Sequence, residues 1–256
     1  MITTEAPLDG ELILQARIMA ASNATFIGHI GEVKVVYKPV AGERPLWDFP
    51  GGTLAGREVA AFALSESLGW DIVPPTWMCD GPLGAGMAQL WRQPDPEQEA
   101  VTLIGGDTEP GEGWCHVFDG VDVQDRPVSL IHEDSPALRR MAVFDIIANN
   151  ADRKASHVLE MADGHRHGVD HGLTFHTEHK LRTVLWGWLD RELHAEELDG
   201  LQRVRKAIDG DLGDALTELL DDDEIAALTA RCDDLLVAGR LPAPPDGFPA
   251  IPWPPF

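Results

Sequence analysis

The sequence predicts an α+β protein, with a β-rich N-terminal part that contains one helix and a C-terminal part that is mostly helical. Three observations lead to this prediction. Alternating and β-branched apolar residues fill residues 11–40, one helical pattern follows at 55–69, and helical spacing dominates after residue 181. The length of 256 residues suits two lobes that share an interface.

The predicted division of the chain follows these changes in pattern. We expect an N-terminal lobe over residues 1–94 and a C-terminal lobe over residues 95–240. Residues 241–256 form a tail that is too rich in proline for helix or sheet. This tail is either a packed polyproline arm or a disordered end.

Strands and one helix are expected in the N-terminal lobe. The strands within residues 11–40 are separated by turn-prone residues, as at 21–23. The helix predicted over 55–69 has apolar residues at helical spacing, and Gly69 is a plausible stop. A further strand is expected over 85–93, because the segment AGMAQLWRQ reads as extended.

A helix and a hairpin are expected early in the C-terminal lobe. Residues 97–134 carry mixed signals with many Gly and Asp, so we expect loops and a partly ordered insert there. Residues 136–150 predict a helix with Ser135 as its N-cap. Two short extended pieces, 157–160 and 166–170, flank a turn and predict a hairpin.

Helices are predicted for most of the chain after residue 181. The segments with helical spacing are 181–193, 197–208, 214–220 and 223–239. Trp186 and Trp188 lie two positions apart in the first of these segments. A helix would therefore point at most one of the two indoles fully into the core.

Charge and cysteine content exclude several classes of function. The formal net charge of -23 repels nucleic-acid phosphates and anionic lipid headgroups, so we expect no nucleic-acid partner. No apolar run approaches the ~20 residues needed to span a bilayer, so we expect no membrane insertion. The three cysteines are far apart and odd in number, which is typical of reduced thiols in a cytoplasmic protein.

Four side chains have the right order and spacing for phosphoryl transfer. This chemistry needs a cation on the phosphates, carboxylates that hold magnesium, and a group that orients the acceptor hydroxyl. Asp152 follows an apolar helix and is a candidate for the orienting base, and Asp170 ends the predicted hairpin as a candidate magnesium ligand. Lys38 ends a strand and could reach the phosphates, while Glu58 on the next helix could hold it by an ion pair.

Four motifs in this order resemble the phosphatidylinositol 3-/4-kinase superfamily. The similarity is closest to the type II 4-kinase branch and to the HipA-type bacterial kinases, and the chain also resembles a mainly actinobacterial family of kinase-like proteins. The motifs are VVYKPV, REVAAFALSESLGWDIVPPT, NNADRKASHVL and VDHGLTF. The resemblance implies a bilobal protein-kinase-like fold, with Lys38 on the nucleotide phosphates, Glu58 as its partner, Asp152 in catalysis and Asp170 on magnesium.

The resemblance also assigns the walls of the nucleotide site. Ser22, Asn23 and Thr25 fall where a phosphate-covering loop would lie, although this segment lacks the glycines of protein kinases. Gln89 and Trp91 fall near the strand and hinge that contact adenine.

The catalytic segment departs from the family pattern at one position. His157 stands where an asparagine that binds metal is expected, and imidazole is a poorer ligand for magnesium than an oxygen. Lys154 either touches a transferred phosphate or faces solvent, and Arg153 is expected to brace the loop. His157 and Asp170 together form the predicted metal pair.

Several candidate residues have a competing interpretation. Lys34 competes with Lys38 for the phosphate-binding role, and Arg57 competes with Glu58 as the residue that points inward. Asp170 is also a plausible turn residue before a glycine.

The predicted function is an ATP- and Mg²⁺-dependent (or Mn²⁺-dependent) phosphotransferase that acts on a protein Ser/Thr or a small soluble acceptor. One alternative is a pseudokinase that binds nucleotide and acts through partners, and another transfers AMP in place of phosphate. A third alternative is a metal-dependent hydrolase built on a crowd of histidines, namely His157, His165, His167, His171, His176 and His179 with Asp170.

Overall fold

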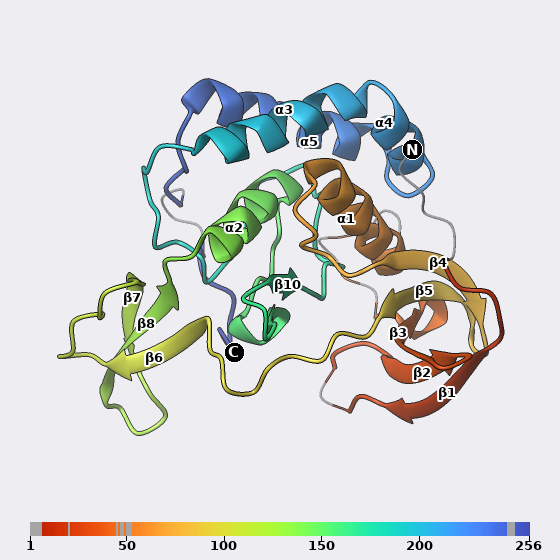
Figure 1. The fold of residues 1–256 in the computed structure, drawn as a ribbon, viewed down its shortest axis with the longest axis horizontal. Coiled ribbons are helices and arrows are strands. Elements are labelled where there is room, and N and C mark those ends of the chain that lie inside the picture. Colours follow the sequence, from red (N-terminus) through yellow and green to blue (C-terminus); the bar gives the residue numbers. More distant parts are fainter. Residues whose placement is uncertain (1–6, 20, 45, 47–48, 50–52, 245–248) are drawn as a thin grey trace.

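The computed structural model describes residues 7–19, 21–44, 46, 49, 53–244 and 249–256. Its N-terminal part is a five-stranded antiparallel sheet with the strand order β1-β2-β3-β5-β4 (Figure 1). The strands are β1 (Leu12–Arg17), β2 (Phe26–Ile30), β3 (Val33–Pro39), β4 (Thr76–Gly81) and β5 (Gly84–Leu90). The alternating pattern of residues 11–40 thus produces three of the strands, as predicted.

Helix α1 (Leu54–Leu68) lies between this sheet and a layer of C-terminal helices (Figure 1). The Thr53 side chain caps its N-terminus by accepting from Gly56 N at 2.9 Å, and Gly69 ends it in a left-handed conformation with φ 68°. Most of its side chains are buried, because the helix has packing partners on several sides. The helix and its stop at Gly69 are therefore confirmed.

A three-stranded antiparallel sheet follows, where the sequence suggested loops and a partly ordered insert. Its strands are β6 (Val101–Gly105), β7 (Trp114–Val121) and β8 (Pro127–Glu133), in the order β6-β8-β7. The prediction for residues 97–134 was wrong, because frequent Gly and Asp in the connections masked short strands. Burial of Val101, Cys115 and Leu130 against the main core stabilises this sheet.

Helix α2 (Pro136–Ala148) and the hairpin after it match the sequence prediction. The Ser135 side chain accepts from Leu138 N at 3.1 Å, and Asn149 ends the helix with φ 53°. A short 3₁₀ turn, η2 (Ala155–His157), leads into β9 (Val158–Glu160), which pairs antiparallel with β10 (Arg166–Gly168). This hairpin lies beneath α2 in Figure 1.

The last three helices form one layer of the molecule (Figure 1). They are α3 (Ala195–Ile208), α4 (Asp211–Thr217) and α5 (Asp222–Ala238), close to the predicted segments. With this layer and the N-terminal sheet, the chain has the predicted α+β fold: a β-rich N-terminal lobe with one helix, and a C-terminal lobe in which helices dominate.

Residues 181–193 form turns and bridges, so the helix predicted there was wrong. Its two indoles are both buried and have hydrogen-bond partners in different segments. Trp186 Nε1 donates to the carbonyl of Ala250 at 2.8 Å, and Trp188 Nε1 donates to Asp134 Oδ1 at 2.6 Å. These tertiary hydrogen bonds outweigh the helical spacing of the segment.

The described part of the proline-rich tail packs against the C-terminal lobe. Thr183 N donates to the carbonyl of Ala250 at 3.0 Å, and Ala155 N donates to the carbonyl of Pro255 at 2.9 Å. Of the two readings of this tail, the structure supports the packed arm for 249–256, while 245–248 lie outside the described residues.

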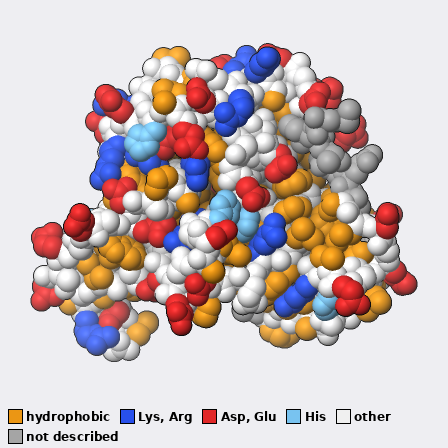
Figure 2. Space-filling model, in the orientation of Figure 1, with side chains coloured by type: hydrophobic (Ala, Val, Ile, Leu, Met, Phe, Trp, Pro, Cys, Tyr) orange, Lys and Arg blue, Asp and Glu red, His pale blue; other side chains and the backbone are white. Residues whose placement is uncertain are grey.

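Acidic side chains are spread over the face of the molecule shown in Figure 2, on the helical layer as well as on the three-stranded sheet. Within the described residues, no helix is long and apolar enough to cross a bilayer.

Candidate functional site

A cavity of about 660 Å³ lies between the N-terminal sheet and the hairpin that follows α2. This volume is within the range of small-molecule sites. Ten of the eleven side chains predicted for the site line it: Ser22, Asn23, Thr25, Lys38, Glu58, Gln89, Trp91, Asp152, His157 and Asp170. Residues from β3, α1, β5 and the β9–β10 region therefore converge, as the motif order suggested.

Lys38 is the point where the two parts of the chain meet inside this cavity. Its ammonium pairs with a carboxylate oxygen of Glu58 on α1, and it lies 2.6 Å from Asp170 Oδ1. The second oxygen of Glu58 accepts from the backbone N of His171 at 3.0 Å, so Glu58 also links α1 to the segment that carries Asp170. Lys34 Nζ instead lies 3.7 Å from the ring centroid of Trp91, which leaves Lys38 as the lysine of this cluster.

The charges in this cluster reinforce one another. Burial works against the charge of Lys38, but the carboxylates of Asp170 and Glu58 outweigh it and raise the pKa of this lysine. In turn, Lys38 lowers the pKa of Asp170 below its ordinary value. Asp170 thus stays ionised and Lys38 stays protonated at neutral pH, as a phosphate and metal site requires.

Asp152 is placed by its own loop. Its backbone N donates to Asn150 Oδ1 at 3.0 Å, just beyond the end of α2. Lys154, the one predicted residue outside the cavity lining, lies with its Nζ 3.1 Å from Asp152 Oδ2. The two candidates for the catalytic roles are therefore in contact with each other.

Arg153 braces the loop from below, as expected. It is fully buried and its guanidinium makes a two-pronged pair with Asp145 of α2, with Nη2–Oδ1 at 2.8 Å and Nε–Oδ2 at 2.9 Å. Its Nη1 donates to the carbonyls of His157 and Val169, at 3.1 and 3.3 Å. One arginine thereby ties the Asp152 loop to the strand end that leads to Asp170.

His157 is held in one tautomer by the loop. Its Nδ1 lies 2.8 Å from the backbone carbonyl of Asp152, and because a carbonyl only accepts, Nδ1 carries the proton. The Nε2 lone pair then faces Asp170 Oδ2 at 3.4 Å. Burial lowers the pKa of His157, so the ring is neutral at pH 7.

Asp170 has an unusual backbone conformation, with φ 61°. A left-handed turn costs less for Asp than for most residues and re-aims its carboxylate toward Lys38. At Gly172, a Cβ would lie 3.2 Å from the Leu54 Cβ, so a side chain there would crowd the start of α1. Asp170 is therefore a turn residue that also lines the cavity, and its role as a metal ligand stays a prediction.

The predicted covering segment and hinge also lie on the cavity. Asn23 Oδ1 accepts from Arg44 N at 3.0 Å, and Thr25 Oγ1 donates to the carbonyl of Asn23 at 3.3 Å. Gln89 is buried, and its Nε2 donates to Thr76 Oγ1 at 2.8 Å. The binding roles of these residues remain predictions.

Sequence reasoning missed three charged residues of the lining: Arg92, which follows β5, and Glu43 and Arg44, which follow β3. The Glu43 carboxylate accepts from the backbone N of Leu54 and of Ala55, at 3.0 and 2.8 Å, and so caps α1 from a distance. With Lys38, Arg44 and Arg92 give the lining three cationic residues. No local pattern marked Glu43 or Arg44, since both lie in the irregular loop after β3.

Arg57, the competitor of Glu58, points inward as well. It pairs with the buried Glu224 of α5 and donates to the carbonyl of Thr174 at 2.6 Å. Neighbouring residues of α1 thus point in different directions. Glu58 contacts the cavity, and Arg57 contacts the layer of C-terminal helices.

The crowd of histidines does not form one cluster. His171 is buried, with Nε2 2.7 Å from Arg153 Nη2 and its ring edge-on to Phe144, and His176 packs edge-on to Phe49. His165 and His167 lie together in the β9–β10 hairpin, with ring centroids 4.4 Å apart.

Comparison with known proteins places the chain in a family. No family model matches it. Among solved structures, the Helicobacter pylori proinflammatory kinase CtkA is similar with a TM-score of 0.45 and 12% identity, over 91% of this chain and 93% of that chain. Protein Rv2133c of Mycobacterium tuberculosis (strain ATCC 25618 / H37Rv) is 46% identical over 260 residues, which cover 97% of this chain and 93% of the relative. The chain belongs to the same protein family as Rv2133c.

Proposed function

We propose that this protein is a phosphotransferase that uses ATP and a divalent metal ion to phosphorylate a hydroxyl acceptor. The observation that carries the proposal is the contact of Lys38 with both Glu58 and Asp170 in a cavity that also contains Asp152 and His157. A lysine held by a helix carboxylate beside a metal-binding aspartate is the arrangement that positions nucleotide phosphates in kinases.

The residues of the chain divide the work. Lys38 binds phosphate oxygens, and Glu58 keeps its ammonium in place. Asp152 orients the acceptor hydroxyl and takes its proton, and the ammonium of Lys154 beside it offsets charge on the transferred group. The acceptor is a protein Ser/Thr or a small soluble molecule, because a net charge of -23 disfavours anionic membranes and nucleic acids.

The donor set fits a divalent metal ion. Asp170 is ionised and His157 presents a lone pair 3.4 Å from it, with its other ring nitrogen hydrogen-bonded to a carbonyl, as is usual for metal-binding histidines. When bound, the metal would neutralise charge on the phosphates. A mixed nitrogen and oxygen set favours Mn²⁺ relative to Mg²⁺.

Calorimetry and product analysis with Asp152→Asn test this function. The wild-type protein should bind ATP with Mn²⁺ or Mg²⁺ and transfer the γ-phosphoryl group. Asp152→Asn should retain binding and lose turnover by about 10²-fold or more, because the general base is removed. Asp125→Asn, the same change in an exposed turn, is the matched control. Absence of ATP binding by the wild type would overturn the proposal.

A nucleotide-binding pseudokinase is the second candidate, and the histidine at position 157 favours it. Binding of ATP with no turnover in any metal, unchanged by Asp152→Asn, would identify this case. Mass spectrometry of the products distinguishes phosphoryl transfer from AMP transfer, which would use the same cavity with ATP reversed.

A further inference from the structure

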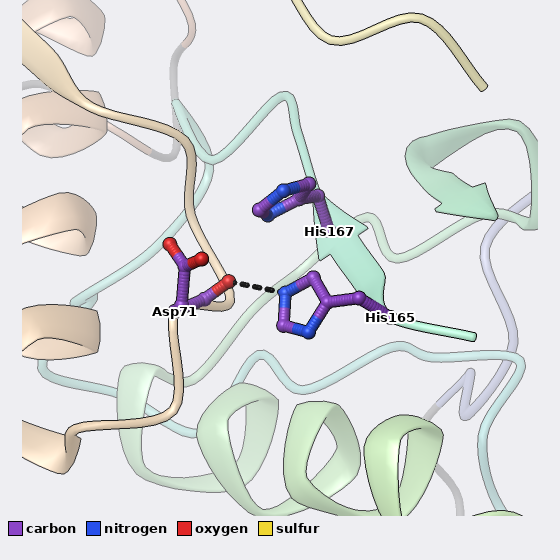
Figure 3. Close-up of side chains that lie close together, drawn as sticks. All are labelled: Asp71, His165 and His167. Atoms are coloured by element: carbon purple, nitrogen blue, oxygen red, sulfur yellow. Dashed lines mark hydrogen bonds between the residues drawn. The ribbon is translucent and has the colours of Figure 1, made fainter. Parts of the chain in front are cut away.

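A second group of potential ligands lies away from the nucleotide cavity. Asp71 lies in the turn between α1 and β4, and His165 and His167 belong to the hairpin of β9 and β10 (Figure 3). None of the three lines the cavity described above. Within the described residues they are the one group of three His, Cys, Asp or Glu side chains whose ligand atoms all lie within 4.8 Å of one another.

The donor atoms suit a transition metal. Two imidazole nitrogens and one carboxylate oxygen make the set that binds Zn²⁺ and other first-row dications, whereas Mg²⁺ prefers oxygens alone. Ligand atoms around a tetrahedral zinc ion are ~3.3 Å apart, given bond lengths of ~2 Å, so small side-chain rotations would close this group around an ion. Three protein ligands leave a coordination position open.

Unsatisfied hydrogen-bonding capacity at His167 is an independent sign of a missing ligand. The side chain is only 4% exposed, and its Nδ1 is buried with no hydrogen-bond partner among the described residues. Buried polar atoms rarely lack a partner, and an ion bound at the site is one established reason.

The turn at Asp71 holds the group in place. Asp71 is left-handed, with φ 51°, and its backbone carbonyl lies 2.7 Å from His165 Nε2 (Figure 3). Next to it, Gly168 N donates to the carbonyl of Ile72 at 2.8 Å. The segments that carry the three donors are thus already joined without a metal. Because a carbonyl only accepts, His165 Nε2 carries the proton in this contact, so metal binding would either use His165 Nδ1 after a rotation of the ring or replace this hydrogen bond.

Charge around the group is mixed but favours a cation. The carboxylates of Glu66 and Asp163 interact electrostatically with Asp71 and with the two histidines, respectively. Arg92 opposes them, since its positive charge acts on His167. The strongly acidic chain adds a general attraction for dications.

We propose that Asp71, His165 and His167 bind a transition-metal dication, with Zn²⁺ as the representative ion, at a site separate from the nucleotide cavity. The ion would clamp the turn after α1 to the β9–β10 hairpin. Because Asp170 follows His167 by three residues, the clamp would restrain the strand end that positions it. The role is therefore structural or regulatory, in addition to the proposed phosphotransfer.

Zinc calorimetry on the full chain tests the site. The wild-type protein should bind one Zn²⁺ that millimolar Mg²⁺ does not displace. Asp71→Asn and His165→Gln should each weaken this binding by at least about tenfold, since each removes one of three ligands. Asn tolerates the left-handed backbone at position 71, so Asp71→Asn tests the ligand without straining the turn. His116→Gln, at an exposed histidine of β7, is the matched control and should bind as the wild type does.

Two further measurements keep the test decisive. Zn²⁺ should raise the Tm of the wild type and of His116→Gln but not of the two site variants, whose circular dichroism without metal should match the wild type. Zinc calorimetry on His157→Asn detects zinc that binds in the nucleotide cavity, because this variant changes a side chain of that cavity and leaves the proposed zinc site intact. The proposal is overturned if the wild type binds no zinc, or if binding persists in Asp71→Asn and His165→Gln and is lost in His157→Asn.

Discussion

Lys38 Nζ lies 2.6 Å from Asp170 Oδ1, although 132 positions separate the two residues in the chain. The contact joins the last turn of the β9–β10 region to strand β3, and Glu58 of α1 completes it. Three elements from both lobes therefore depend on one ammonium group, and its removal leaves two facing carboxylates without a counter-charge.

Lys38→Met should weaken ATP binding strongly. The substitution removes a charged hydrogen-bond donor to phosphate, which is worth about 1.5–3 kcal/mol, or roughly 10- to 100-fold in Kd. Isothermal calorimetry with ATP and Mn²⁺ measures the effect. Lys206→Met, at an exposed position on α3, is the control and should bind like the wild type. Equal affinities for the two variants would place the phosphates elsewhere.

His157→Asn should change the metal preference of the proposed reaction. Asparagine replaces a nitrogen ligand with an amide oxygen, so activity with Mg²⁺ should rise relative to activity with Mn²⁺ by several-fold. Initial rates at saturating ATP in each metal give the ratio. His116→Asn provides the matched substitution at an exposed site. An unchanged ratio would show that position 157 does not contact the metal.

Arg153→Met should destabilise the fold. It leaves Asp145 as a buried carboxylate without its partner, and loss of one member of a buried pair costs roughly 3–5 kcal/mol. Urea unfolding measures the change in free energy, and the double variant with Asp145→Leu should lose less than the sum of the single losses. Arg126→Met, whose pair with Asp122 is exposed, should change stability by less than about 0.5 kcal/mol.

His132 should make stability depend on pH between about 4 and 6.5. Burial lowers its pKa from 6.5 to about 4, and its Nε2 accepts from Gly187 N at 2.9 Å, which requires the neutral ring. The unfolded chain binds the proton more readily, so the stabilisation is complete above pH 6.5 and is lost as pH falls toward 4. The full loss is roughly 3 kcal/mol for this group.

Urea unfolding of His132→Gln at pH 7.5 and pH 5 measures this contribution. The variant is expected to lose less stability between the two pH values than the wild type, because glutamine does not titrate. His116→Gln should keep the wild-type difference. If His132→Gln also kept it, another buried group would be responsible, with His171 the first to examine because burial lowers its pKa as well.

The local signals in the sequence were sufficient to predict the helices whose start and end are marked by capping residues. Thr53 and Ser135 cap the N-termini of helices α1 and α2, and left-handed Gly69 and Asn149 follow their last residues. Each of these features is a local preference of the residue concerned. Motif order and the family resemblance also predicted that Lys38, Glu58, Asp152 and Asp170 lie together, and all four line the candidate cavity. Their spacing places each one at the end or on the face of a predictable element.

Other features were decided by contacts between distant segments. Residues 181–193 have helical spacing, yet they do not form a helix. The indole of Trp186 donates a hydrogen bond to the carbonyl of Ala250, and that of Trp188 donates to the carboxylate of Asp134. The three-stranded sheet depends on burial against the main core more than on the patterns of its short strands.

By itself, then, the sequence determined the α+β class and the capped helices, because these follow from local backbone preferences, and the family resemblance predicted most of the residues that line the candidate cavity. Only the tertiary structure decided that Asp71 lies beside His165 and His167, although 94 positions separate Asp71 from His165 in the chain. It also decided that Arg44 lines the cavity. The physical reason is that a turn residue carries no local sign of its distant partner, and the pairing arises only when separate elements pack against each other.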